Sequence, residues 1–139
     1  MSDVRQVVAA LIVREGSFLI CQRTRHQTMP LKWEFPGGKI EKGEGPVAAL
    51  VRELDEELGI HASIGRKVAS IRHSYRGGGA VDLHFYLVER YQGDIENRIF
   101  RDVQWVTPAD LPTYDFLEAD LSLVRDLADG KLRQASDKP

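Results

Sequence analysis

The chain of 139 residues is 42% hydrophobic and 29% charged, a composition typical of one globular domain with a buried core. Its 19 basic and 21 acidic side chains give a net charge of −2, which argues against broad electrostatic binding to a nucleic acid polymer or an anionic membrane. The longest apolar run, residues 7–13, is too short to span a bilayer. The polar start of the chain has no secretory-signal pattern, and the single Cys21 cannot form an internal disulfide. We therefore expect a cytoplasmic protein.

The first half of the chain predicts strands followed by a helix. Residues 4–14 and 18–23 are rich in Val, Leu and Ile, with a turn at 15–17 between them. Residues 24–45 contain Pro and Gly and predict irregular structure. The pattern becomes helical over 46–58, where Pro46 suits the first helical position and Gly59 suits the left-handed residue that ends a helix.

The second half predicts a hairpin, a short strand and a second helix. Strand patterns at 64–75 and 80–91 flank Gly77-Gly78-Gly79, which we interpret as a hairpin turn because no helix follows to bind a phosphate. A strand at 100–106 and a helix at 117–128 complete the pattern. Mixed strands with two helices predict an α/β sandwich. Residues 1–133 would form a single domain and residues 134–139 a loose tail.

The predicted helix 46–58 carries an apolar stripe beside an acidic one. At about 100° per residue, one arc holds the apolar side chains that would pack on the sheet: Val47, Leu50, Val51, Leu54 and Leu58. Glu53, Glu56 and Glu57 occupy the adjacent arc, so their carboxylates would converge. Hard cations such as Mg²⁺ or Mn²⁺ prefer such oxygen ligands. Taken alone, a solvated acidic face with Arg52 paired to Glu56 explains this pattern at least as well.

The spacing around this helix is far more specific. Residues 38–60 read G-x5-E-x7-R-E-U-x-E-E-x-G-U, where U is a bulky aliphatic residue; a chance match in a chain this long has a probability on the order of 10⁻⁸. The pattern resembles the Nudix box without any departure, and residues 33–39 resemble the MutT-like branch of that family. The resemblance implies an α/β/α sandwich with a mixed central sheet, and Mg²⁺- or Mn²⁺-dependent hydrolysis of nucleoside diphosphates linked to another group.

The resemblance also implies roles for the residues of the box. Gly37, through its carbonyl, and Glu53, Glu56 and Glu57 resemble the metal ligands. Glu53 is the most plausible general base, although the family is not uniform in this role. Arg52 would orient Glu53 by a charge-assisted hydrogen bond. Glu44 would reach the metal cluster directly or through water. Gly38 and Lys39 are expected beside the substrate.

Three further residues are candidates for contacting the nucleotide, each with an ordinary alternative. Arg23 resembles a MutT-like position near the nucleotide, or is a surface arginine. Phe35 would stack on the base, or belongs to the core. Asp120 stands where MutT-like members place an Asn or Asp that binds the base edge, or is an acid favoured in the first turn of a helix.

Some MutT-like members have one more metal-binding Glu before the strand of Trp105. The aligned position here is Ile99, so this ligand is in doubt, and Glu96 or Asp102 are the acids available to substitute.

The resemblance predicts an enzyme that converts (deoxy)nucleoside triphosphates into nucleoside monophosphate and pyrophosphate by attack of water on the β-phosphorus. Its substrate would be an oxidised purine nucleotide such as 8-oxo-dGTP, or a cytidine nucleotide; both a monomer and a simple homodimer stay open. A second hypothesis keeps the chemistry but changes the substrate to ADP-ribose or a dinucleoside polyphosphate. A third, a nucleotide-sensing domain without turnover, is disfavoured because every carboxylate of the box is present.

Overall fold

The computed structural model describes residues 4–131, so the predicted tail 134–139 and the first and last residues of the predicted domain lie outside it. Within residues 4–131, nine strands and two α-helices follow one another, with two short 3₁₀ helices (η) before the last helix. In chain order they are β1 (Val4–Arg14), β2 (Ser17–Gln22), β3 (Trp33–Glu34), β4 (Gly37–Lys39), α1 (Pro46–Leu58), β5 (His61–Ser63), β6 (Lys67–Ser74), β7 (Ala80–Val88), β8 (Arg90–Gln92), β9 (Asp102–Val106), η1 (Pro108–Thr113), η2 (Glu118–Asp120) and α2 (Leu121–Ala128).

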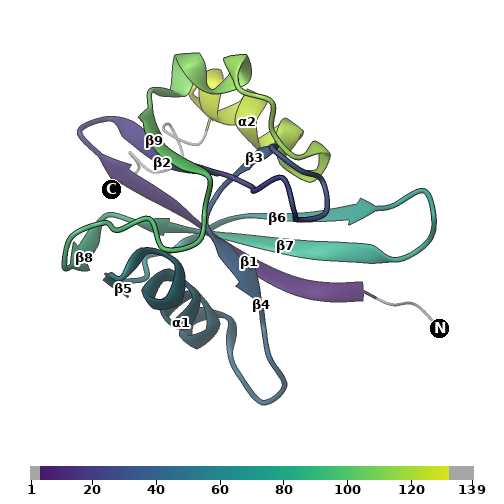
Figure 1. Ribbon diagram of the computed structural model, residues 1–139, viewed down its shortest axis with the longest axis horizontal. Coiled ribbons are helices and arrows are strands. Elements are labelled where there is room, and N and C mark those ends of the chain that lie inside the picture. The colour runs from purple at the N-terminus through teal and green to yellow at the C-terminus, as the bar shows by residue number, and fades with distance from the viewer. Residues whose placement is uncertain (1–3, 132–139) are drawn as a thin grey trace.

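The central sheet is mixed, as predicted. Its strand order is β3-β2-β1-β7-β6, with β4 also paired to β1 and β9 to β2 (Figure 1). The β1–β7 pair is parallel, whereas β1–β2 and β6–β7 are antiparallel. On one side of β1, β4 pairs with residues 7–9 and β2 pairs with residues 13–14. This arrangement brings the short strand β4 into the middle of the molecule.

Each face of the sheet is covered by one helix, which confirms the predicted sandwich. Successive side chains of a strand point to opposite faces, and β1 sends Val8, Ala10 and Ile12 into the core beneath α1. Ala9 and Leu11 enter the second core, beneath α2. The two helices accordingly lie on opposite sides of the sheet (Figure 1). None of the helices within residues 4–131 has the length and apolar character needed to cross a bilayer.

Helix α1 has the predicted bounds. It begins at Pro46 and ends at Leu58, and Gly59 adopts a left-handed φ of 68° while its N–H donates to the Asp55 carbonyl. The prediction that Val47 packs on the sheet is wrong, because this side chain is 46% exposed. The whole first turn, residues 45–48, is exposed, and the helix reaches the core only from Ala49 onward.

Other differences from the predicted elements come from pairing between distant segments. Strands β3 and β4 lie in a region predicted to be irregular, and β4 forms from Gly37-Gly38-Lys39 because β1 offers it a partner. The predicted strand 80–91 is divided: β7 stays in the main sheet, whereas β8 pairs with β5 in a separate two-stranded sheet. The predicted helix 117–128 is shorter, since η2 precedes α2, and η1 was not predicted.

Candidate active site

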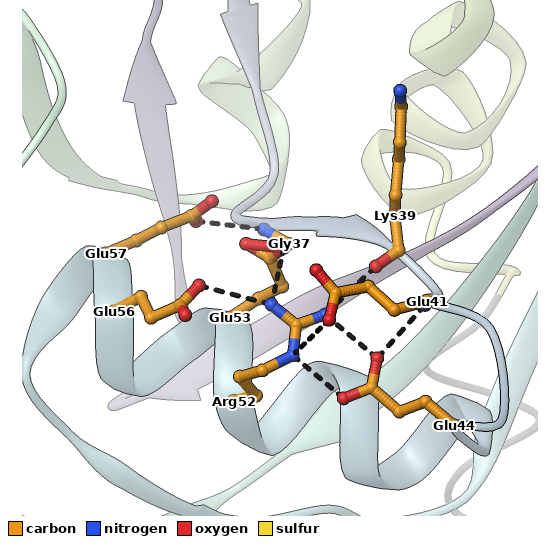
Figure 2. A network of polar contacts seen from close by, with 8 residues as sticks. All are labelled: Gly37, Lys39, Glu41, Glu44, Arg52, Glu53, Glu56 and Glu57. Atoms are coloured by element: carbon orange, nitrogen blue, oxygen red, sulfur yellow. Dashed lines mark hydrogen bonds and ion pairs between the residues drawn. The ribbon is translucent and has the colours of Figure 1, made fainter.

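Arg52 is the centre of a network of carboxylates on α1 and on the loop before it (Figure 2). Its Nε and Nη2 donate to the two oxygens of Glu44 at 2.8 and 2.9 Å, and this pairing lowers the pKa of Glu44 to about 2. Its Nη1 donates to Glu53 and to Glu56, each at 3.2 Å, and its Nη2 also donates to the Lys39 carbonyl at 3.1 Å. One guanidinium therefore links α1 to β4 and orients Glu53.

Glu53 and Glu57 face the backbone of β4. The Gly37 N–H donates to Glu57 Oε1 at 3.2 Å (Figure 2). A Cβ atom on Gly38 would collide with the Glu53 carboxylate, with Oε1 only 2.7 Å away. The backbone of β4 therefore approaches both carboxylates closely, which the absence of side chains at Gly37 and Gly38 permits.

Of these two carboxylates within residues 4–131, Glu53 shares the Arg52 guanidinium with Glu44 and Glu56, whereas no ion pair is formed by Glu57. Glu57 is 8% exposed; burial, and then the charges of Glu53 and Glu34, raise its pKa to about 9. Burial also raises the pKa of Glu53, against the opposing effect of Arg52. A buried carboxylate, Glu57, and a half-buried one, Glu53, lie next to each other and to the backbone of β4. This donor set fits a hard divalent cation, which would offset the repulsion between the two carboxylates.

The third carboxylate of the predicted set has a different orientation. The Glu56 side chain is 58% exposed and is paired with Arg52, so it does not converge with Glu53 and Glu57 as expected. Within residues 4–131, no three His, Cys, Asp or Glu side chains stand together in a ready-made metal cluster. Of the three predicted acidic ligands, Glu53 and Glu57 lie together beside β4, whereas Glu56 lies apart from them, next to Arg52.

A cavity of about 330 Å³ opens beside these carboxylates; we call it the catalytic cavity. Its lining includes residues of α1, of β4 and of η2. Most of the predicted site residues line it, and these are Arg23, Phe35, Gly37, Gly38, Lys39, Glu53, Glu57 and Asp120. The site residues predicted from the sequence thus come from four separate segments of the chain, and the fold brings these segments together around one cavity.

Arg23 is not a surface arginine, which was the alternative to a position near the nucleotide. Its side chain is 17% exposed, and its guanidinium donates to the Thr28 carbonyl at 2.8 Å, to Thr28 Oγ1 at 3.1 Å and to Glu34 Oε1 at 3.1 Å. These bonds hold the loop 24–32 against β3. Because Gln27, Thr28 and Met29 of this loop line the catalytic cavity, Arg23 shapes the cavity wall.

Phe35 belongs to the core, which was the second of the two roles predicted for it, the first being stacking on the base. It is 4% exposed, and its ring centroid lies 5.3 Å from that of Phe116 and 6.2 Å from that of Phe85. Such aromatic packing holds the ring in place. Phe35 still forms part of the cavity wall, but most of its surface is committed to the interior.

Asp120 is buried rather than displayed in the first turn of a solvated helix. It ends η2 and is 4% exposed. Burial, and then the charge of Glu34, raise the pKa of Asp120 to about 8. Sequence reasoning missed Glu34, which lines the same cavity and whose pKa burial also raises. Its place between Trp33 and Phe35, within the MutT-like segment, was the available signal.

The acids considered as an additional metal ligand are engaged elsewhere. Glu96 Oε1 accepts a hydrogen bond from Arg98 at 2.9 Å, and Arg98 in turn donates to the Asp55 carbonyl near the end of α1. The Asp102 carboxylate accepts from the Val103 N–H at 2.8 Å. Ile99, in contrast, lines the catalytic cavity.

Comparisons with known proteins agree with this geometry. The family model described as the NUDIX domain matches residues 3–127. The chain is 38% identical over 119 residues to the CTP pyrophosphohydrolase of Escherichia coli (strain K12), covering 86% of this chain and 87% of that protein. It is 35% identical over 129 residues to the 8-oxo-dGTP diphosphatase of the same organism, covering 88% and 95%. Among solved structures, the solution structure of the E. coli ORF135 protein matches with a TM-score of 0.86 at 36% identity, covering 99% of this chain and 96% of that one.

Proposed function

This chain belongs to the Nudix family, in its MutT-like branch, and we propose that it hydrolyses a nucleoside triphosphate to the monophosphate and pyrophosphate, with a cytidine nucleotide or 8-oxo-dGTP as its substrate. The observation that carries the proposal is the two-ended character of the catalytic cavity. Two carboxylates, Glu53 and Glu57, line the end beside α1 and β4, and the buried carboxyl group of Asp120 lines the end beside η2. Burial raises the pKa of both Glu57 and Asp120, and a divalent cation at the first end would favour the ionised form of Glu57. A nucleotide has the matching polarity, with an anionic chain that needs a cation and a neutral base that needs hydrogen bonds.

At the acidic end, Gly37, Glu53 and Glu57 would hold a Mg²⁺ or Mn²⁺ ion, and Glu56 would join them after turning away from its present partner Arg52. Such an ion neutralises phosphate oxygens and acidifies bound water. Glu53 accepts the proton of the attacking water in this proposal, and the Arg52 guanidinium, 3.2 Å from its Oε2, fixes the carboxylate for that task. Lys39, on the wall of the same cavity, supplies a positive charge for the phosphate chain.

At the other end, the protonated Asp120 carboxyl group offers one O–H donor and one C=O acceptor. This pair matches N3 and the N4 amino group of cytosine, and it equally matches O6 and N1–H of a guanine ring. The relatives act, by their names, on CTP and on 8-oxo-dGTP, so both bases fit the same two hydrogen bonds. Burial raises the pKa of Asp120, and the charge of Glu34, on the same cavity wall, raises it further.

The test is a substrate panel with Mg²⁺ that includes CTP, dCTP, 8-oxo-dGTP, dGTP, ADP-ribose and diadenosine polyphosphates. We expect pyrophosphate release from CTP or 8-oxo-dGTP with kcat/KM at least tenfold above that of the other compounds. Reaction in ¹⁸O-labelled water should place the label in pyrophosphate, as attack on the β-phosphorus requires. Glu53→Gln serves as the inactive control. Turnover of only ADP-ribose or the dinucleotides would replace the substrate assignment, and label in the monophosphate would reject the site of attack.

A further inference from the structure

A second cavity of about 380 Å³ lies beside the catalytic cavity, between the end of β6 and the segment that leads into α2; we call it the outer cavity. It is a direct continuation of the first, because four residues line both: Met29, Tyr75, Leu117 and Ala119. Ala119 immediately precedes Asp120. A base bound to Asp120 would therefore lie next to the junction between the two cavities.

The outer cavity is lined mainly by aromatic and apolar side chains. His73 and Tyr75 meet edge to face with ring centroids 5.0 Å apart, and Tyr114 packs against Trp33 in the same geometry at 5.0 Å. Met29 and Leu121, both 43% exposed, complete the wall. Rings held in this way, together with a thioether, suit a planar apolar group.

The charged groups of the outer cavity disfavour a phosphate as its occupant. Lys32 is paired with Asp115 at 2.8 Å, and Glu118 adds a further negative charge to the lining. An anionic group in this cavity would therefore meet two carboxylates and one cation that is already neutralised. The charges of the lining therefore disfavour an anionic occupant, and the aromatic and apolar side chains favour an uncharged group that extends from the base.

We propose that the outer cavity is a subsite for an apolar ring attached to the nucleobase, so that the enzyme accepts triphosphates whose base is enlarged by such a substituent. The proposal rests on the proposed function, since it uses the base end of the catalytic cavity as its starting point. It adds a class of substrate, base-substituted nucleotides, which a cavity closed around an ordinary base would exclude.

The test compares the parent triphosphate with its benzyl derivative on the exocyclic amino group, N4-benzyl-CTP for CTP or N2-benzyl-8-oxo-dGTP for 8-oxo-dGTP. The quantity measured is the ratio of kcat/KM for the derivative to kcat/KM for the parent. Leu121→Trp places a large side chain in the outer cavity. Leu31→Trp is the matched control, because Leu31 is similarly exposed at 40% and lines neither cavity.

We expect the ratio to fall about tenfold in Leu121→Trp and to change less than twofold in Leu31→Trp. A fall of less than threefold in Leu121→Trp, or an equal fall in both variants, overturns the proposal. A second measurement does not need turnover. Backbone amide chemical shifts are recorded while N4-benzyl-CMP or CMP is added to the protein. Shifts at Tyr114 and Leu121 with the benzyl compound alone support the subsite even if no triphosphate is hydrolysed, in which case only the proposed function fails. Identical shifts with both compounds reject the subsite.

Discussion

Replacing Gly38 by Ala should disable the active site while leaving the fold nearly intact. The new Cβ would collide with Cδ and Oε2 of Glu53 and lie 2.7 Å from its Oε1, whereas ordinary contacts begin at about 3.4 Å, so the carboxylate has to retreat by at least about 0.7 Å. Misplacement of a catalytic group by about 1 Å costs roughly 100-fold in rate. We therefore expect kcat for pyrophosphate release to fall about 30- to 100-fold. Because a flexible side chain gives way, the free energy of unfolding should change by less than about 1 kcal/mol.

Gly37→Ala provides the contrast that separates active-site geometry from stability. Its Cβ would collide with the Val8 carbonyl and lie 2.7 Å from the Ala9 Cα, and both are backbone atoms of the central strand β1. Overpacking against backbone costs about 3 kcal/mol, which corresponds to a fall in Tm of roughly 10 °C for a domain of this size.

The assays are steady-state pyrophosphate release with Mg²⁺ and thermal unfolding followed by circular dichroism. Gly77→Ala is the control for both variants, since a Cβ there meets nothing within 4 Å. If Gly38→Ala folds normally and keeps more than half of the wild-type kcat, the close approach of β4 to Glu53 does not control the reaction. If Gly37→Ala is as stable as Gly77→Ala, the packing argument fails.

Three other perturbations follow from the site. Glu53→Gln should lower kcat by several orders of magnitude while the Kd for nucleotide, measured by calorimetry, changes little; unchanged turnover would remove Glu53 from proton transfer. Asp120 keeps its proton in the native state up to a pKa of about 8 but loses it near 3.8 when unfolded, so its contribution to stability falls as pH rises between these values. Asp120→Asn should therefore gain stability relative to wild type at pH 8 compared with pH 5 in urea unfolding, and an equal difference at both values would contradict this. Arg23→Lys removes bonds to Thr28 and Glu34 and should raise KM about tenfold, a loss of about 1.4 kcal/mol in binding, because the loosened loop forms part of the cavity wall. A tenfold loss in kcat with unchanged KM would instead place Arg23 in the chemical step.

Features that depend on neighbouring residues were predictable from the sequence. The bounds of α1 follow from Pro46 and Gly59, which act on the backbone next to them. The spacing of Arg52, Glu53 and Glu57 on one helix follows from helical periodicity alone. The hairpin at 77–79 is confirmed as well, with Ser74 opposite Ala80. In each case the physical cause lies within a few residues of the effect.

Features that depend on distant contacts were not predictable in this way. Glu56 and Glu57 are adjacent and chemically identical, yet Glu57 is buried against Gly37 and Glu56 pairs with Arg52. Strand β4 exists because β1 pairs with it, although its own sequence has little strand character.

By itself, then, the sequence determined the helix, its acidic face and the family to which the chain belongs. The tertiary structure decided which carboxylates face one another, that Phe35 belongs to the core, and that Arg23 braces the cavity wall. It also decided that the pKa of Asp120 is raised, because the burial and the nearby Glu34 charge that cause the shift arise only when segments far apart in the chain are packed together.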